Sequence, residues 1–287
     1  MNNLLLFDFN NLLMKAISAT PDLEFNGKHT GGLYGFLNQI CKYINDFEPK
    51  KIIVCSDLPP YFRKKEYPQY KANRKPQTPE RYELIQTSRK YCKELLEVLG
   101  IAFWELEGME ADDLIAIAVD EYTTEFDSII AVSNDDDLFQ LFKYPNFKLQ
   151  KNKEIWTRKT FESMYPVSIQ DWLTVKALSG SHNGVPGIKG IGLKTALKIV
   201  QDDQKLDNIQ KQHGKEIDQY ERLIYLPYIP FDSKKCTSEL WDEVKKLKQI
   251  IPKRNNERAF MHFLNQFNIL YTPNMKKAFQ IIGGHNV

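Results

Sequence analysis

The sequence has few of the residues that mark several common classes of protein. Only 4 cysteines occur among 287 residues, with no CxxC pair and none of the 5 histidines at zinc spacing. We therefore expect reduced, buried thiols rather than a disulfide framework or a zinc site. No apolar run approaches the roughly 20 residues that cross a bilayer, so no membrane contact is expected. The amino terminus also lacks the basic segment of a signal peptide, which favours a soluble, cytoplasmic protein.

Charge is nearly balanced overall but unevenly distributed along the chain. The formal net charge is +2, yet residues 60–94 contain ten Lys or Arg against four Asp or Glu. Residues 105–137 contain twelve Asp or Glu and not one Lys or Arg. The basic segment suits binding of a polyanion, and the acidic segment, which also contains apolar blocks, suits binding of divalent cations. Together they indicate a polyanionic ligand held at bound cations, and nucleic acid is the leading candidate.

Short apolar runs alternate with helical patterns over the first 165 residues. We expect strands at 4–7, 52–55, 101–104 and 128–132, with further ones near 147–150 and 155–156. Helices are expected at 31–47, 79–99 and 110–122, and a turn at Asn26-Gly27. This alternation predicts an α/β fold with a mostly parallel central sheet flanked by helices. The rest of the chain is expected to be helical, at 168–178, from 193 onward, and around 216–227, 239–250 and 256–267.

Acidic residues follow the ends of the expected strands. Four segments supply them: Asp8; Asp57; Glu110, Asp112 and Asp113; Asp135 and Asp137. Because ligand sites in such sheets form beyond the carboxyl ends of the strands, these carboxylates are expected to converge. Mg²⁺ prefers hard oxygen ligands of this kind. The alternative for the 110–113 group alone is stabilisation of a helix N-terminus, worth about 0.3–1 kcal/mol each.

Five motifs occur in order along the chain. They are Leu-Phe-Asp-Phe-Asn (6–10), Ser-Asp-Leu (56–58) with the basic run 62–75, Gly-Met-Glu-Ala-Asp-Asp (108–113), Ser-Asn-Asp-Asp-Asp-Leu-Phe-Gln-Leu (133–141) and Gly-Val-Pro-Gly-Ile-Lys-Gly-Ile-Gly (184–192). In this the sequence resembles the 5′ nuclease family, which includes the 5′–3′ exonuclease domains of bacterial DNA polymerases, flap endonucleases and phage ribonuclease H-type enzymes. The resemblance covers residues 3 to about 200, and the C-terminal helices look most like the phage members.

The resemblance implies a PIN-like nuclease core over residues 1–165, including an arch at 60–99, and a helical DNA-binding region over 166–287. It assigns the first metal site to Asp8, Asp57, Glu110 and Asp112, with Asp113 beside them. It assigns Asp135 and Asp137 to a second metal site. The implied cofactor is Mg²⁺ or Mn²⁺, with one ion bound firmly.

The second site departs from the family pattern. The family usually has Gly-Asp-x-x-Asp-Asn before its hairpin, whereas this chain has Gly180-Ser181-His182-Asn183-Gly184, with neither aspartate. Asp136 could compensate, and so could His182 or Asn183, although an ordinary surface loop is the simpler interpretation of 180–184. We therefore expect the second metal ion to bind weakly, or only with ligands from DNA.

The basic segment resembles the family's helical arch over the active site. Lys71 and Arg74 match its catalytic, phosphate-contacting bases, Arg63 is a further candidate contact, and Tyr70 is expected to stack on a terminal base. Base–aromatic stacking contributes on the order of 1–3 kcal/mol without sequence preference. The alternative is a solvated basic face, which the interleaved tyrosines make less attractive.

Residues 187–192 resemble the family's helix–three-turn–helix, which binds the duplex backbone beside a monovalent cation, here K⁺. The implied ion ligands are the carbonyls of Ile188 and Ile191. The implied DNA contacts are Lys189, Gly190, Gly192, Lys194 and Thr195. Without the resemblance, this Gly-rich segment would be read as a turn between helices.

The expected function is metal-dependent hydrolysis at 5′ ends or flaps of DNA, and of RNA primers on DNA, during replication in a bacterial or phage-infected cell. The partners would be flapped, nicked or primer-bearing DNA, with replication proteins as further candidates, and the protein is expected to be a monomer. Two alternatives remain at this point. One is a catalytically weakened structure-specific DNA-binding protein of the same fold, and the other is a single-strand RNase of the PIN-like group.

Overall fold

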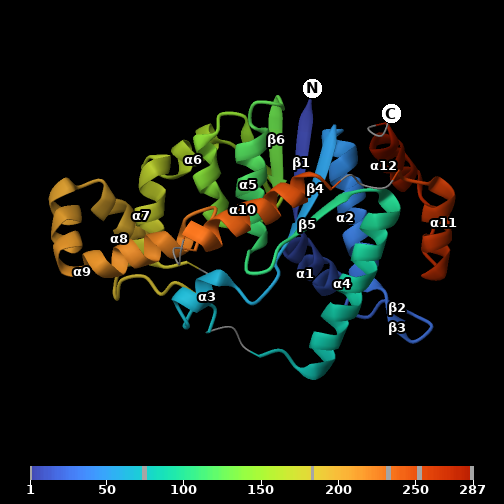
Figure 1. Cartoon of the computed structure of the whole chain (residues 1–287), viewed down its shortest axis with the longest axis horizontal. Coiled ribbons are helices and arrows are strands. Elements are labelled where there is room, and N and C mark those ends of the chain that lie inside the picture. Colours follow the sequence, from blue (N-terminus) through green and yellow to red (C-terminus); the bar gives the residue numbers. More distant parts are fainter. Residues whose placement is uncertain (1, 73–75, 182–183, 231–233, 251–253, 285–287) are drawn as a thin grey trace.

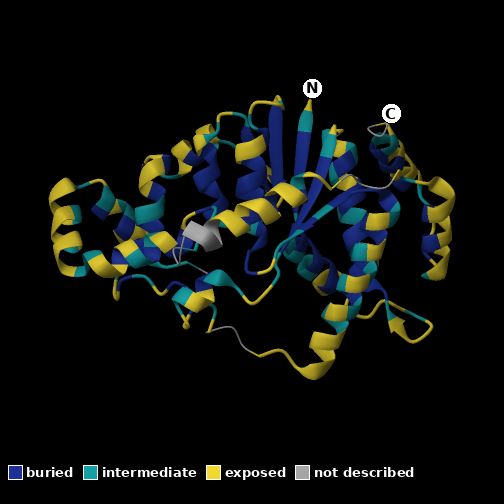
Figure 2. Ribbon diagram, viewed as in Figure 1, coloured by how far each residue is buried: buried dark blue, intermediate teal, exposed yellow. Residues whose placement is uncertain are grey.

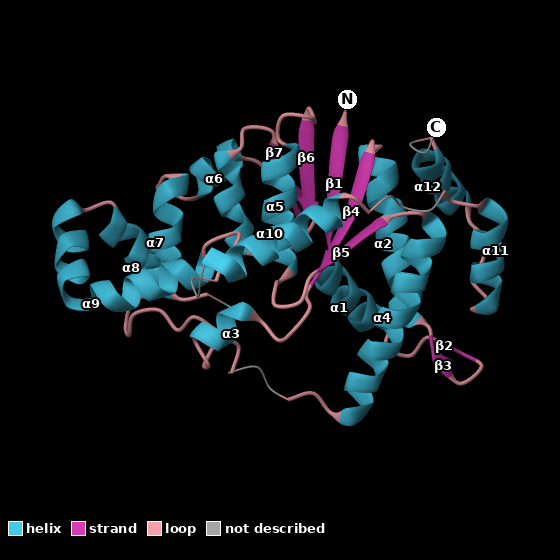
Figure 3. Ribbon diagram, in the orientation of Figure 1, coloured by secondary structure: helices cyan, strands magenta, loops and turns pink. Residues whose placement is uncertain are grey.

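The computed structural model describes residues 2–72, 76–181, 184–230, 234–250 and 254–284. Its centre is a six-stranded sheet with the order β5-β4-β1-β6-β7-β8 (Figure 3). The strands are β1 (Asn3–Asp8), β4 (Lys51–Ser56), β5 (Ala102–Glu105), β6 (Ser128–Val132), β7 (Phe147–Lys151) and β8 (Glu154–Trp156). All neighbouring strands are parallel except β7 and β8, which are antiparallel. The predicted mostly parallel sheet is confirmed.

Helices connect the strands and form the C-terminal part of the chain. They are α1 (Phe9–Ala19), α2 (Gly31–Phe47), α3 (Phe62–Glu66), α4 (Pro79–Leu99), α5 (Ala111–Tyr122), the 3-10 helix η1 (Asp136–Lys143), α6 (Arg158–Met164), α7 (Ile169–Ser179), α8 (Leu193–Val200), α9 (Asp203–Ile224), α10 (Lys234–Lys248), α11 (Glu257–Gln266) and α12 (Pro273–Gly283). A small hairpin of β2 (Glu24–Phe25) and β3 (Lys28–His29) contains the predicted turn. No specific bounds for η1, α6 or α12 were predicted from the sequence, although the region of α12 was expected to be helical, and α9 begins well before residue 216.

The sheet is buried on both faces (Figure 2), because successive side chains of a strand point to opposite sides. On one side, Leu6 and Ile53 belong to a hydrophobic cluster with residues of α5, η1 and α7. On the other, Leu5 and Val54 belong to a cluster with residues of α1, α2 and α4. The continuous apolar runs in the sequence are the consequence of this double burial.

The C-terminal helices divide between these two faces. Helix α12 lies beside α2, and α11 lies beside α4 (Figure 1). Their side chains, such as Phe260 and Phe279, pack in the cluster of α1, α2 and α4. Side chains of α7, α8 and α9 pack in the opposite cluster. Residues after 166 therefore contribute to both hydrophobic clusters of the core, and the division into residues 1–165 and 166–287 stays a prediction about function.

The carboxyl ends of the strands point toward α3 and the segment that follows it (Figure 1). Of the described residues between 61 and 78, those in regular structure form the five-residue helix α3, and α4 then begins with Pro79 as predicted. In the described residues, the predicted helical arch at 60–99 consists of the short helix α3, turns at 68–72 and the long helix α4. No helix in the described ranges is both long and apolar enough to cross a membrane.

Candidate active site

The distinguishing feature of this edge of the sheet is a cavity with an acidic lining. The cavity beyond the carboxyl ends of β1, β4 and β6 has a volume of about 910 Å³. Its lining includes carboxylates from four separate segments: Asp8, Asp57, Glu110, Asp112 and Asp135. The convergence that the sequence predicted is therefore confirmed for these residues.

Strand ends and helix starts hold two of these carboxylates in place. Asp8 ends β1 and caps α1, where its Oδ1 accepts a hydrogen bond from the Asn11 amide at 3.0 Å. Its Oδ2 accepts one from the Ser133 hydroxyl at 2.7 Å, which ties β1 to the segment after β6. Asp57 follows β4, and its Oδ1 accepts from the Ala111 amide at 2.8 Å, at the first turn of α5. Each aspartate thus satisfies a helix N–H that lacks an intrahelical partner.

Local turns orient the other two aspartates of the cavity. Asp112 lies in the first turn of α5, and its Oδ1 accepts from the Asp113 amide at 2.8 Å. Asp135 caps η1, and its Oδ1 accepts from the Asp137 amide at 2.9 Å. Both aspartates belong to short segments that follow the strand ends, so their positions are fixed by the sheet edge.

The electrostatics of the cavity favour a bound cation. Burial and, after it, the nearby charges of Asp57 and Asp135 raise the pKa of Asp8 from 3.8 to about 6. Burial and the neighbouring Asp113 likewise raise the pKa of Asp112 well above its usual value. A divalent cation would compensate this crowding of negative charge, and carboxylate oxygens are the hard ligands that such an ion prefers. The donor set therefore fits one divalent ion.

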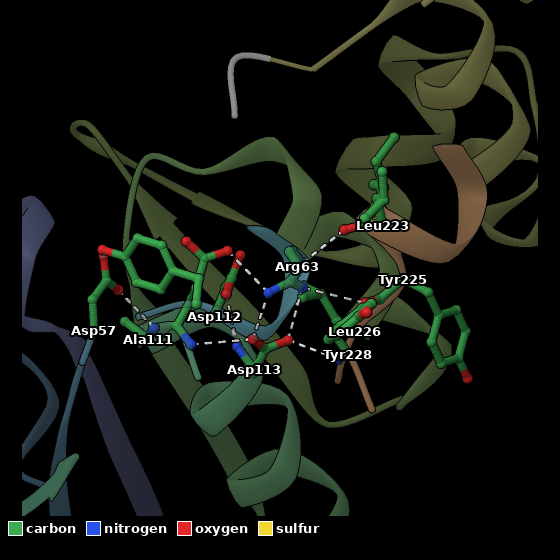
Figure 4. Close-up of polar contacts among 12 residues, drawn as sticks. Asp57, Arg63, Ala111, Asp112, Asp113, Leu223, Tyr225, Leu226 and Tyr228 are labelled. Carbon is green, nitrogen blue, oxygen red and sulfur yellow. Dashed lines mark hydrogen bonds and ion pairs between the residues drawn. The ribbon is translucent and has the colours of Figure 1, made fainter. Parts of the chain in front are cut away.

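Asp113 accepts hydrogen bonds from buried groups of the protein. Arg63 Nη1 donates to its Oδ2 at 2.6 Å and Arg63 Nη2 to its Oδ1 at 2.8 Å (Figure 4). The Tyr228 amide also donates to Oδ1, at 2.7 Å. The side chains of Arg63 and Asp113 are only 3% and 1% exposed. Glu110, Asp112 and Asp113 have oxygens within 4.8 Å of one another, so the role of Asp113 as a metal ligand stays a prediction beside its contacts with Arg63 and Tyr228.

Arg63 requires a correction, since the sequence placed it among the DNA contacts. Its Nε donates to the Leu223 carbonyl at 2.7 Å, so its guanidinium joins α3 to the start of α5 and the end of α9 (Figure 4). A buried guanidinium that already binds carboxylates and a carbonyl is not placed to contact a DNA phosphate.

Tyr70 and Glu110 form a second buried connection next to this one. The Tyr70 side chain is 2% exposed, and its hydroxyl donates to Glu110 Oε2 at 2.7 Å. Because the ring is enclosed by the protein, the predicted stacking of Tyr70 on a terminal base is wrong for this structure. Glu110 Oε2 also accepts from Arg63 at 2.9 Å, and its Oε1 pairs with Lys71 Nζ. Glu110 is thus a cavity-wall carboxylate held by cationic side chains, and its role as a metal ligand stays a prediction.

Lys71 lines the cavity, as expected for a base that contacts the scissile phosphate. Its backbone has a φ of +58°, and Gly184 packs directly against it. A Cβ at Gly184 would lie 2.4 Å from the Lys71 nitrogen, so only glycine is tolerated there. The loop before the hairpin therefore supports the basic segment. Arg74, the other predicted catalytic base, lies outside the described residues.

Lysines lie beside two of the aspartates at the predicted second metal site, and the role of these aspartates as metal ligands stays a prediction. Asp136 is ion-paired with Lys151. Asp137 is 4% exposed, and its Oδ1 lies 3.3 Å from Lys176 Nζ. His182 and Asn183 lie outside the described residues. Two of the three consecutive aspartates at 135–137 are thus matched by lysines, and Asp135 lines the cavity.

The predicted hairpin presents its polar groups to solvent. Lys189, Gly190, Gly192, Lys194 and Thr195 are all exposed, while the Ile188 side chain is buried. The Ile188 carbonyl accepts from the Ile191 amide at 3.0 Å, closing the turn. Gly190 has a φ of +85°, which favours glycine. The exposed groups are accessible to a nucleic-acid backbone, and the roles of the Ile188 and Ile191 carbonyls stay predictions.

Arg89 is a site residue that the sequence analysis missed. From α4 it donates to Asn10 Oδ1 at 3.1 Å, to Ser56 Oγ at 2.8 Å and to the Asp57 carbonyl at 3.1 Å. It also pairs with Glu105 at the end of β5. Arg89 therefore holds the strand end that carries Asp57. Arg89 lies in the basic segment 60–94, and the composition of that segment does not indicate that its partners lie on three other elements.

Comparison with known proteins gives consistent matches. Residues 3–166 match the family described as "5′-3′ exonuclease, N-terminal resolvase-like domain". A 5′-3′ exonuclease of Bacillus subtilis is 33% identical over 220 residues, which are 72% of this chain and 73% of that protein. A DNA polymerase I of Caldicellulosiruptor bescii is 34% identical over 222 residues, 74% of this chain but only 26% of the polymerase.

Among solved structures, a T5 5′-exonuclease described with bound divalent metal ions (zinc) has the same fold. Its TM-score is 0.70 at 19% identity, and the alignment covers 86% of this chain and 99% of that one. The PIN-like sheet flanked by helices, with a helical C-terminal region, is thereby confirmed as the fold.

Proposed function

Since the chain belongs to the 5′-3′ exonuclease family, we propose that it is a structure-specific 5′ nuclease that hydrolyses phosphodiesters at 5′ ends or flaps of DNA. The cofactor would be Mg²⁺ or Mn²⁺, with K⁺ at the hairpin. Its substrates in replication would include nicked DNA and RNA primers on DNA. We propose that it acts as a monomer.

One observation carries this proposal. Carboxylates from four segments, Asp8, Asp57, the 110–112 group and Asp135, line a single cavity at the carboxyl edge of the sheet. Lys71 lines the same cavity, which places a cation for phosphate beside oxygen ligands for a metal. This combination suits a phosphodiester, whose negative charge needs compensation before water can attack it.

Asp8, Asp57, Asp112 and Asp135 would hold the cation, and Glu110 would complete its surroundings. A bound divalent cation supplies Lewis-acid assistance to phosphodiester hydrolysis. Lys71 would exchange its Glu110 partner for an oxygen of the substrate phosphate, since both are anionic acceptors of its ammonium. Arg89 keeps Asp57 at the cavity by holding the end of β4. Arg74 is proposed as a second base beside the phosphate.

DNA would reach the cavity from two sides. The segment 60–78 would receive the 5′ end, and the exposed hairpin groups at 189–195 would bind the duplex backbone. Backbone contacts position a duplex but do not read its sequence, so selectivity would be for structure. In this scheme residues 1–165 carry the chemistry, and the helices after 166 carry most of the duplex contacts.

The test compares three labelled duplexes of one sequence: a 5′ flap, a nick and a flap whose 5′ end is blocked by a bulky group. We expect cleavage of the first two with Mg²⁺ or Mn²⁺, none with EDTA, and strong inhibition by the block. Tight binding without cleavage under all metal conditions would instead identify a structure-specific binding protein. If duplex DNA added as a competitor abolishes cleavage of single-stranded RNA, the PIN-like RNase alternative is excluded.

A further inference from the structure

Asp137 forms a buried ion pair with Lys176. Its Oδ1 lies 3.3 Å from the lysine Nζ, and the two side chains are 5% and 9% exposed. Burying a lysine ammonium to this degree costs free energy of folding unless a carboxylate compensates its charge. The pair joins η1, directly after the strand end of β6, to α7 in the helical region.

Lys176 lies near the loop that precedes the hairpin. Lys176 lines a second cavity, of about 410 Å³, together with Asp136, Gly180, Ser181 and Val185. Trp172, one turn before Lys176 on α7, donates from Nε1 to the Asp136 carbonyl at 3.2 Å. Lys176 therefore faces the same cavity as Asp136 and the described loop residues Gly180, Ser181 and Val185.

The same loop lacks the two aspartates that the family pattern has before its hairpin. Residues 180–184 read Gly-Ser-His-Asn-Gly, so the aspartates at 135–137 receive no carboxylate partners from the loop for a second divalent ion. They have lysines instead, since Lys151 pairs with Asp136 and Lys176 with Asp137. An ammonium of single charge matches one carboxylate, whereas a divalent ion needs several oxygen ligands.

We propose that the Lys176 ammonium takes the place of a second divalent cation beside Asp137, leaving the protein with one divalent-cation site and one built-in cation. The inference rests on the proposed function, because it concerns the same catalytic region. Lys176 acts through Asp137, so it is a positioning residue that balances charge at the start of η1. It also explains how the chain dispenses with carboxylates at 180–184.

The experiment is a titration of the full chain with Mn²⁺, without DNA, followed by electron paramagnetic resonance and calorimetry. The wild type is expected to bind one Mn²⁺ per chain in the low-concentration range. In Lys176→Gln, which can still donate a hydrogen bond to Asp137, a second Mn²⁺ is expected to bind at least about tenfold more tightly than in the wild type, because a nearby positive charge is gone. Lys176→Arg keeps the charge and should behave as the wild type.

A double variant guards against loss of folding. Lys176→Gln with Asp137→Asn removes both charges of the buried pair, so it should fold and should bind one Mn²⁺ only. Two Mn²⁺ of similar affinity in the wild type would overturn the inference, as would an unchanged second affinity in folded Lys176→Gln or a second ion in the double variant. Absence of any Mn²⁺ binding by the wild type would instead contradict the proposed function.

Discussion

Arg63 and Asp113 face each other as a two-pronged ion pair that is almost completely buried, with donor–acceptor distances of 2.6 and 2.8 Å. The pair connects α3 to the start of α5, so it fixes the helix that presents Asp112 to the cavity. Arg63, which the sequence placed among the DNA contacts, thus belongs to the buried framework that holds the site together.

Breaking this pair should destabilise the protein strongly. Arg63→Ala leaves the Asp113 carboxylate buried without its partner, and we expect a loss of about 3–5 kcal/mol in the free energy of unfolding. Chemical denaturation measures it. Lys42→Ala, which breaks the exposed pair between Lys42 and Asp46, is the matched control and should cost at most about 1 kcal/mol. Equal effects of the two substitutions would show that the Arg63 pair is not structurally important.

The raised pKa of Asp8 predicts how stability depends on pH. Its value of about 6 in the folded protein lies above the usual 3.8, so between these two values the folded state binds more protons than the unfolded state. The metal-free protein should therefore lose stability as pH rises through about 4 to 6. Asp8→Asn should be more stable than the wild type at pH 7–8, by about 1–2 kcal/mol. Thermal melts at pH 4.5 and 7.5, with and without Mg²⁺, measure this.

Added Mg²⁺ should reverse the effect in the wild type only. Because the ion binds the ionised carboxylates, it should raise the melting temperature at pH 7.5 and have little effect at pH 4.5. The raised pKa of Asp8 would be contradicted if, in EDTA, the melting temperature of the wild type rose relative to that of Asp8→Asn between pH 4 and pH 7.

Lys71 is expected to affect turnover on every substrate alike. Lys71→Ala should lower kcat by about 10–100-fold, because it removes a cation from the scissile phosphate, and the loss should not depend on the base sequence. Single-turnover cleavage of flaps with three unrelated sequences measures it. Lys42→Ala, a change of the same charge on the exposed side of α2, should leave the rate nearly unchanged. A sequence-dependent loss would indicate a base contact instead.

The hairpin lysines should contribute electrostatically to duplex binding. Lys189→Ala and Lys194→Ala should each weaken affinity for all duplexes and reduce the slope of log K against log salt by about 1. Fluorescence anisotropy at several salt concentrations gives the slope. Lys205→Ala, in α9 and paired with Asp202, serves as the control of equal charge. Unchanged slopes for both hairpin variants would remove the hairpin from the DNA interface.

The sequence predicted the sheet and the acidic edge for a clear physical reason. Strands buried on both faces must be continuous apolar runs, and residues directly after parallel strands must meet at one edge. Asp8, Asp57 and Asp135 could be placed by these two rules alone. The resemblance to a nuclease family then supplied their chemistry.

The misplaced residues share a different property. Arg63 and Tyr70 lie in a basic, aromatic segment whose composition resembles a DNA-binding surface, but their partners Asp113 and Glu110 are about 40 or more positions away. Composition cannot reveal a buried pairing between distant segments. For Lys176 a signal was present, because it shares a helix face with the buried residues Ile169 and Trp172. A lysine on an apolar face indicates a buried carboxylate partner.

The most direct measurement of the central claim is cleavage of a 5′-flap duplex by Asp112→Asn compared with Asp120→Asn. Both substitutions remove one carboxylate from α5, but only Asp112 lines the cavity. We predict that Asp112→Asn lowers the cleavage rate by about a thousandfold or more while flap binding is retained, since several kcal/mol of metal assistance are lost. Asp120→Asn should cleave at close to the wild-type rate. Equal rates for the two variants would contradict a metal-dependent nuclease site at this edge of the sheet.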